Sequence, residues 1–167
     1  KMVAVTNQNN KQTGFPVKLV FKAGLFAGLL DISCAFIYSY IKRGTSPTTV
    51  LKFIAEKVFG KDVFTNDMLL SITGLLIHFT IAMFWAFVFF MFYRNLKLMR
   101  SNTIVTGIMY GLFVWVMMNV ILLPAWDNKV YEFNGAASII SAVILIIAIG
   151  LPLSYIANKN YKSDKAL

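Results

Sequence analysis

Apolar residues fall into four long blocks along the chain, and the short stretches between them hold most of the charged residues. Each block exceeds the roughly 18 to 20 residues that an α-helix needs to cross about 30 Å of hydrocarbon. The period-2 alternation of a membrane β-barrel is absent, so helices are the only spanning structure available. The pattern therefore predicts four transmembrane helices, at about 17–41, 67–93, 103–124 and 136–157.

The connection at 42–66 carries the signals of a further, shorter helix. Ser46 and Pro47 are typical of an N-cap followed by proline at the first helical position, and Gly60 is typical of a terminator. Apolar residues recur at helical spacing between them: Val50, Phe53, Ile54 and Val58. We expect an amphipathic helix at about 47–59, in the membrane interface or capping the bundle. It would act as a lid or, as we favour, as a packing element that joins two spans.

These elements define the fold class that we expect. It is an all-α, polytopic membrane protein, with four transmembrane helices in an up-down bundle and the interfacial amphipathic helix between spans one and two. A single transmembrane domain at 17–157 would follow a polar N-terminal tail at 1–16 and precede a basic C-terminal tail at 158–167. Pro124 is expected to close the third span and Pro152 to kink or end the fourth, because proline lacks the backbone N–H that a helix needs.

Composition agrees with a membrane protein and narrows its partners. Apolar residues make up 58% of the 167 residues and aromatic residues 15%, which is more apolar surface than a soluble domain of this size can bury. The net charge is +9, but the cations flank the spans and form no stripe interleaved with aromatic side chains. Anionic lipid headgroups are therefore expected as partners, and nucleic acid is not.

The basic residues predict an orientation. With four spans, both termini and the 94–102 loop lie on one side, and this side holds ten of the sixteen Lys and Arg residues: Lys1, Lys11, Lys18, Lys22, Arg94, Lys97, Arg100, Lys159, Lys162 and Lys165. The positive-inside rule then predicts cytoplasmic N- and C-termini. Five cations of the 42–66 connection oppose this prediction from the outer side: Lys42, Arg43, Lys52, Lys57 and Lys61.

Two spans contain a G-x-x-x-G motif, formed by Gly24 with Gly28 and by Gly107 with Gly111. Small residues let helix backbones approach closely, which matters because lipid offers no hydrophobic drive for helix association. We expect all four glycines to pack helices together. Packing within the chain is the default, and packing between chains stays open.

Two ionisable residues lie deep in the predicted spans, Asp31 and His78, each roughly 15 to 17 Å from the same end of the bundle. An ionised Asp at the bilayer centre costs about 2.5 to 3.5 kcal/mol, so Asp31 should face the bundle interior. The first two spans are antiparallel, which allows a contact with His78. Asn119 is the third deep polar residue; it either joins this intramembrane polar cluster or, as we favour, forms a hydrogen bond between helices.

Three interpretations of Asp31 and His78 stay open. A structural hydrogen bond would fix the register of two helices. A proton-carrying or cation-binding site would fit the functional bias of intramembrane ionisable residues. A metal or haem site would need ligands from a second subunit, because His78 is the only histidine. We therefore predict no cofactor and no bound metal.

Motifs of enzymes are missing: the sequence has no nucleophile elbow, no H-E-x-x-H and no glycine-rich phosphate loop. We predict a non-enzymatic accessory or structural subunit that packs against another membrane protein or a second copy. The alternative is a small proton- or cation-coupled transporter or channel that uses Asp31 and His78. It would be oligomeric, because four helices are few for a monomeric transporter.

The segment 23–124 resembles a widespread family of small uncharacterised bacterial membrane proteins. The resemblance is carried by four stretches: Ala23 to Ala35, Ser46 to Ala55, Gly74 to Ala82, and Gly107 through Asn119 to Pro124. Asp31, His78, Asn119 and Pro124 match motif positions of that pattern. The resemblance implies a four-helix protein of the bacterial inner membrane and brings no established activity.

Overall fold

All of the secondary structure in the computed structural model is helical within the residues that it describes, 16–60, 66–127 and 133–163. Four helical segments are long and apolar enough to cross a membrane: Val17–Arg43, Asp67–Asn95, Thr103–Trp126 and Gly135–Tyr161. The all-α class and the four apolar spans predicted from the sequence are therefore confirmed.

The first two long segments are each one continuous helix, α1 (Val17–Arg43) and α3 (Asp67–Asn95). Each of the other two has a π-helical part between two α-helical parts. The third segment consists of α4 (Thr103–Trp115), η2 (Val116–Leu122) and α5 (Leu123–Asp127). The fourth consists of α6 (Gly135–Leu145), η3 (Ile146–Gly150) and α7 (Leu151–Ser163). Two short helices lie in the connections, α2 (Pro47–Phe59) and the 3₁₀ turn η1 (Lys97–Arg100).

Side chains of Asn and Ser start three of these helices. Oδ1 of Asn66 accepts hydrogen bonds from two backbone N–H groups at the start of α3, at 2.9 and 3.2 Å. Asn102 does the same for α4, at 3.0 and 3.2 Å. Oγ of Ser46 accepts from the backbone N–H of Thr49 at the start of α2. Each cap satisfies donors that the first helical turn leaves unpaired.

Pro124 and Pro152 were expected to end or kink their spans, and neither ends its helix. The third helix continues through Pro124 to Asp127, and the fourth through Pro152 to Ser163. Both prolines lie two residues after a π-helical segment, η2 or η3. A proline in an α-helix clashes with the carbonyl four residues earlier. The wider π turn, with its i−5 hydrogen bonds, gives that carbonyl room.

The fourth helix also reaches beyond the predicted span end at 157. Its last turns stay folded because Tyr161 packs on Tyr93 of α3, with ring centroids 5.3 Å apart, and under the guanidinium of Arg100, 5.2 Å from the ring centroid. The predicted basic tail is thus helical up to Ser163. Residues 164–167, and all of the predicted N-terminal tail except Pro16, lie outside the described residues.

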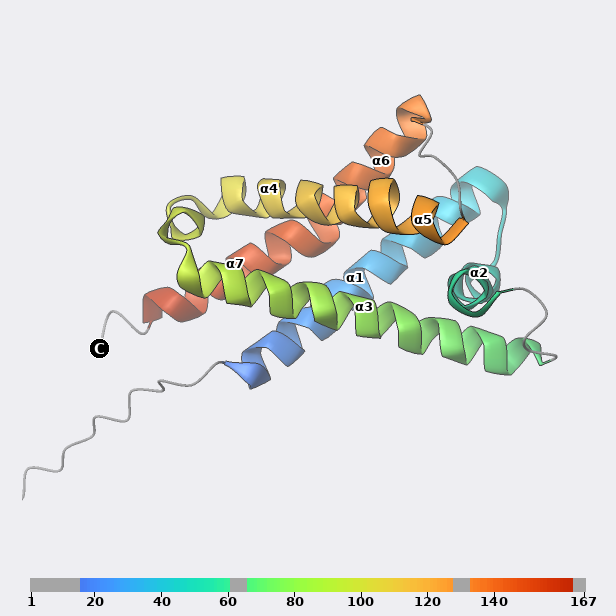
Figure 1. The fold of residues 1–167 in the computed structure, drawn as a ribbon, viewed down its shortest axis with the longest axis horizontal. Helices are drawn as coiled ribbons and strands as arrows, with labels where there is room; N and C mark the ends of the chain where they lie inside the picture. Colours follow the sequence, from blue (N-terminus) through green and yellow to red (C-terminus); the bar gives the residue numbers. More distant parts are fainter. Residues whose placement is uncertain (1–15, 61–65, 128–132, 164–167) are drawn as a thin grey trace, which may run out of the picture.

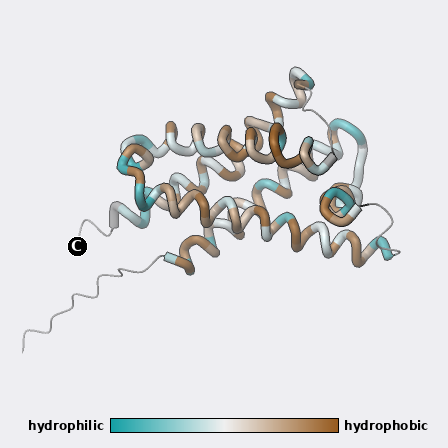
Figure 2. Tube along the Cα trace, viewed as in Figure 1, coloured by the Kyte–Doolittle hydropathy of each residue, from teal (hydrophilic) through white to brown (hydrophobic). Residues whose placement is uncertain are grey.

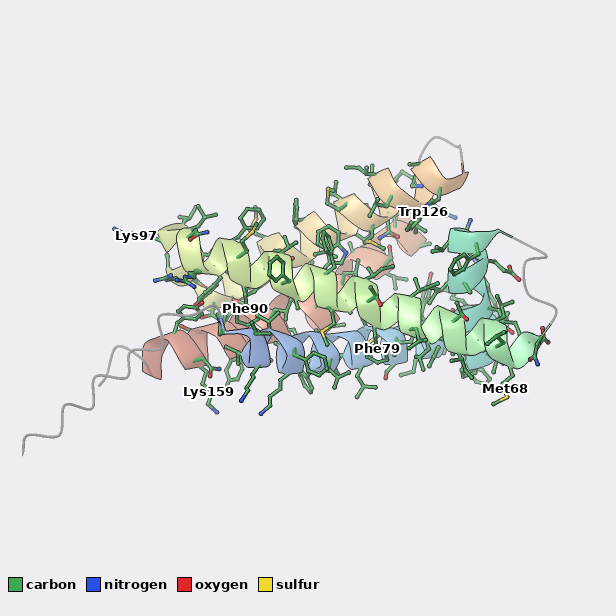
Figure 3. The ribbon with its side chains drawn as sticks, turned by 60° about the horizontal axis from the view of Figure 1, so that its bottom comes forward. Met68, Phe79, Phe90, Lys97, Trp126 and Lys159 are labelled. Atoms are coloured by element: carbon green, nitrogen blue, oxygen red, sulfur yellow. The ribbon has the colours of Figure 1, made fainter. Side chains whose placement is uncertain are left out.

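The long helices run along the length of the molecule (Figure 1), with α1 against α3 and α4 against η3 and α7. The α3–α4 turn lies at one end and α2 at the opposite end. Hydrophobic residues follow the long helices, and hydrophilic residues gather at the α3–α4 turn and in the connection from α1 to α2 (Figure 2). Figure 3 shows Lys97 and Lys159 at the first end and Met68 and Trp126 at the other.

A solid core fills the half of the bundle near the α3–α4 turn, which we call the solid end. Its aromatic centre is formed by Phe89, Phe90, Tyr93 and Tyr110. Phe89 meets Tyr110 edge-to-face with 4.8 Å between ring centroids, a favoured aromatic geometry. The hydroxyl of Tyr110 donates a hydrogen bond of 2.5 Å to the backbone carbonyl of Trp85. This bond ties α4 to α3.

Glycines bring the helices of this core into backbone contact. We call Gly107, Gly111 and Gly150 the glycine contact: a Cβ added at Gly111 would lie 2.5 Å from Cα of Ile146, and one added at Gly150 would overlap the carbonyl oxygen of Gly107. On the other side of the bundle, a Cβ at Gly24 would lie 2.6 Å from Sδ of Met83. Larger residues at these positions would push the helices apart.

Candidate functional site

A cavity of about 300 Å³ opens between the helices in the half of the bundle near α2, which we call the hollow end. Residues of all four spans and of α2 line it. Its volume is at the lower end of the roughly 300 to 1,000 Å³ typical of small-molecule pockets. The bundle thus contains a site large enough for a small ligand.

The lining changes in character along the cavity. Toward the solid end, the walls are apolar and include Trp85, Val114 and Ile149, all of them buried. Three polar residues from three different spans follow, Asp31, His78 and Asn119. Side chains of α2 and α5 form the mouth: Phe53, Ile54, Lys57, Val58 and Trp126.

Asp31 lies near the middle of α1, three residues beyond Gly28 on the face that packs against α3. Its side chain is half-buried and lines the cavity. Within the described residues its carboxylate receives no hydrogen bond and forms no ion pair, since the one ion pair joins Lys52 to Asp67. The cavity therefore exposes a carboxylate in mostly apolar surroundings.

His78 bonds to the backbone of α1 and not to Asp31. Its Nε2 lies 2.9 Å from the carbonyl oxygen of Gly28. Because a carbonyl can only accept, Nε2 carries a proton, and Nδ1 is an acceptor whenever the imidazole is neutral. Asp31 and His78 line the same cavity, and no hydrogen bond or ion pair between the two side chains is present within the described residues.

Asn119 does not form the interhelical hydrogen bond that we favoured. Its Nδ2 donates to the carbonyl of Trp115, one turn earlier in the same helix, at 3.2 Å. Asn119 lies in the π-helical segment η2, where i−5 bonding leaves some carbonyls open to a side-chain donor. Its Oδ1 is left as an acceptor, and the residue lines the cavity beside the other two polar groups.

The structure thus brings Asp31, His78 and Asn119 to one cavity and leaves the four motif glycines outside it. Gly24 and Gly28 lie at the α1–α3 contact, where Gly28 faces Ala82 and Phe79. Gly107 and Gly111 lie in the glycine contact defined above. The glycines close helix pairs, and the polar residues face the space that remains open.

The sequence left two positions open for α2, in the membrane interface or capping the bundle. Phe53, Ile54 and Val58 line the mouth of the cavity. Nζ of Lys57 lies 5.0 Å from the centroid of the Phe53 ring, a cation–π geometry that holds a positive charge at the mouth. The apolar spacing marked the face of the helix, but nothing local indicated what it covers.

Two contacts hold α2 against α3. A Cβ added at Gly74 would overlap the carbonyl oxygen of Leu51, so the two backbones touch. Lys52 forms an ion pair with Asp67 at the start of α3. These contacts pack α2 on α3, and both interpretations of the helix, a packing element and a lid, stay predictions.

The indole N–H of Trp85 is the one buried side-chain donor without an acceptor in the described part of the chain. The same part of the chain holds no group of three or more His, Cys, Asp or Glu side chains placed to bind a metal ion.

No protein-family model, curated protein or solved structure matches the chain.

Proposed function

We propose that the protein is a multi-pass integral membrane protein whose cavity binds a proton or a small cation at Asp31, as the binding site of a small carrier or channel. One observation carries the proposal: polar residues from three spans, Asp31, His78 and Asn119, line the same cavity. A carboxylate and an imidazole in one cavity can exchange protons with each other and with a ligand.

The energetics of a membrane support this role for Asp31. A charged carboxylate at the bilayer centre costs about 2.5 to 3.5 kcal/mol on insertion scales, and a bound cation or proton removes most of that cost. Within the described residues, no partner of Asp31 does so by a hydrogen bond or an ion pair. A proton or cation bound at Asp31 would supply this compensation.

The membrane arrangement belongs to the same proposal. The helices cross the bilayer up and down, α2 lies at the outer interface, and the basic α3–α4 turn with Arg94, Lys97 and Arg100 lies in the cytoplasm with both termini. Anionic lipid headgroups would face these cations. The resemblance of 23–124 to small bacterial inner-membrane proteins supports the cytoplasmic membrane of a bacterium as the location.

Proton flux tests the proposal. Protein in liposomes that contain a pH-sensitive dye should dissipate an imposed pH gradient faster than protein-free liposomes, and Asp31→Asn should lower that flux by about tenfold or more. Glu56→Gln is the matched control: it makes the same change in charge at a side chain that does not line the cavity and forms no ion pair within the described residues. Equal flux with and without protein would refute the carrier function.

The accessory-subunit function stays a prediction, and the same preparation can test it. Mass spectrometry of protein purified gently from its own membranes should show another membrane protein in a fixed stoichiometric ratio if the chain is a subunit of a complex. A homo-oligomer that conducts protons alone would favour the carrier.

A further inference from the structure

The polar groups in the middle of the cavity mostly accept hydrogen bonds. Asp31 offers two carboxylate oxygens, His78 offers Nδ1 and Asn119 offers Oδ1. Their donors are largely engaged elsewhere, since Nε2 of His78 bonds Gly28 and one N–H of Asn119 bonds Trp115. A ligand that matches these three residues must bring hydrogen-bond donors and a positive charge, while the indole N–H of Trp85 offers one unpartnered donor in the inner part of the cavity.

Ser141, on the α6 side of the cavity, has no free hydrogen-bond donor. Its Oγ accepts from Nε1 of Trp115 at 2.8 Å and donates to the carbonyl of Ser138 at 2.9 Å, so its proton is already used. It does not add a donor to the cavity. The wall that α6 contributes therefore does not favour an anion.

The apolar inner part of the cavity argues against a bare metal ion. Trp85, Val114 and Ile149 offer no side-chain oxygen, and a hard cation such as Mg²⁺ or Ca²⁺ needs about six oxygen ligands. An apolar group of a ligand would fill this part by packing against those three side chains. The cavity therefore fits a molecule with one cationic end and one apolar end.

We propose that the ligand of this cavity is a small organic cation, a protonated alkylamine or arylalkylamine. Its ammonium group donates to Asp31, Nδ1 of His78 and Oδ1 of Asn119, and its apolar tail lies against Trp85, Val114 and Ile149. This inference rests on the proposed function, because it names the class of cation that the cavity binds.

Lys57 gives the proposal a second, independent consequence. Its ammonium lies at the mouth, over the ring of Phe53. Lys57→Gln removes this charge from the lining and leaves the three acceptor residues in place, so n-hexylamine should still bind more tightly than sodium hexanoate in this variant.

Binding of three matched probes tests the ligand class. Protein in nanodiscs is titrated with n-hexylamine, 1-hexanol and sodium hexanoate, with empty nanodiscs as the reference for partition into lipid, and heat is measured by calorimetry. n-Hexylamine should bind at least about tenfold more tightly than either of the other two, because it alone adds a charge-assisted hydrogen bond to Asp31. Equal affinities for n-hexylamine and 1-hexanol, or a preference for hexanoate, would overturn the inference.

Variants locate the site. Asp31→Asn should weaken n-hexylamine binding by about tenfold and change 1-hexanol binding by less than about twofold, while Glu56→Gln, at a side chain that does not line the cavity, should change neither. If Asp31→Asn does not fold, Ile144→Phe tests the location of the site instead, because the larger side chain narrows the same cavity from α6. This variant should weaken n-hexylamine binding by about tenfold. Unchanged n-hexylamine binding in whichever of the two variants folds would overturn the inference.

The two proposals fail in different ways. Tight n-hexylamine binding that depends on Asp31, in a protein without proton flux, would remove the carrier function and leave the ligand class standing. Proton flux that depends on Asp31, with n-hexylamine binding that does not, would overturn the ligand class and leave the carrier function standing.

Discussion

The two ends of this bundle are built from the same four spans and differ in how far the helices come together. At the solid end, the glycine contact brings α4 against η3 and α7, and aromatic rings fill the space to α3. At the hollow end, the first turns of α6 rise away from α5 (Figure 1), and the cavity with Asp31 lies between the helices. The glycines at the solid end let the helix backbones touch there, so the placement of small residues closes this end.

This difference separates stability from function. In lipid, helices associate through close van der Waals packing and hydrogen bonds, not through the hydrophobic effect. The solid end supplies that packing, together with bonds such as that from Oγ of Ser154 to the carbonyl of Thr103 at 2.7 Å. The hollow end gives up packing and keeps three polar side chains facing an open space. Substitutions should therefore act on stability at one end and on binding at the other.

The largest effect is expected at the glycine contact. Gly150→Leu places a side chain where the carbonyl of Gly107 lies, and neither backbone can yield without separating two spans, so we expect a loss of about 3 kcal/mol or more of folding free energy. Unfolding by SDS in mixed micelles measures it. Ile147→Phe is the control, because Ile147 lies on the same π segment and is 57% exposed to the surroundings. A wild-type midpoint for Gly150→Leu would show that the contact does not hold the solid end together.

A smaller loss is expected from the aromatic core. Phe89 is fully buried, and Phe89→Ala leaves a void of about 100 Å³, which costs about 2 kcal/mol at the usual cavity penalty. Phe84→Ala, on the same helix, removes a ring that is 57% exposed and should cost less than about 0.5 kcal/mol. The same SDS titration compares the two. Similar losses for both variants would mean that this end is not packed more tightly than its lipid-facing surface.

The smallest effect concerns one hydrogen bond. Tyr110→Phe removes the hydroxyl that bonds the carbonyl of Trp85 and should cost about 0.6 to 1 kcal/mol, as interhelical hydrogen bonds in membranes do. It should leave n-hexylamine binding within about twofold, because the bond lies outside the polar part of the cavity. Tyr155→Phe serves as the control at an exposed tyrosine. A change in n-hexylamine binding without a change in stability would show that this hydrogen bond at the solid end acts on the cavity at the hollow end.

Much of the fold could be predicted because membrane spans are marked by length and apolarity alone, which need no knowledge of the rest of the chain. The inward position of Asp31 followed from the cost of exposing it to lipid. The hydrogen bond of Asn119 could not be predicted, because it depends on the π geometry of η2. The cavity could not be predicted either, because it is the space left after distant helices have packed.

The π segments have a consequence for how this sequence can change. A deletion in a packed α-helix turns every later side chain by about 100° and ruins the interface. Since a π turn holds one residue more than an α turn, a one-residue deletion inside η3 would straighten the helix and keep the rest in phase. Pro152 would then face a carbonyl with no room to move aside, so the deletion becomes viable only with Pro152→Ala. The extra residue of η3 and Pro152 therefore depend on each other.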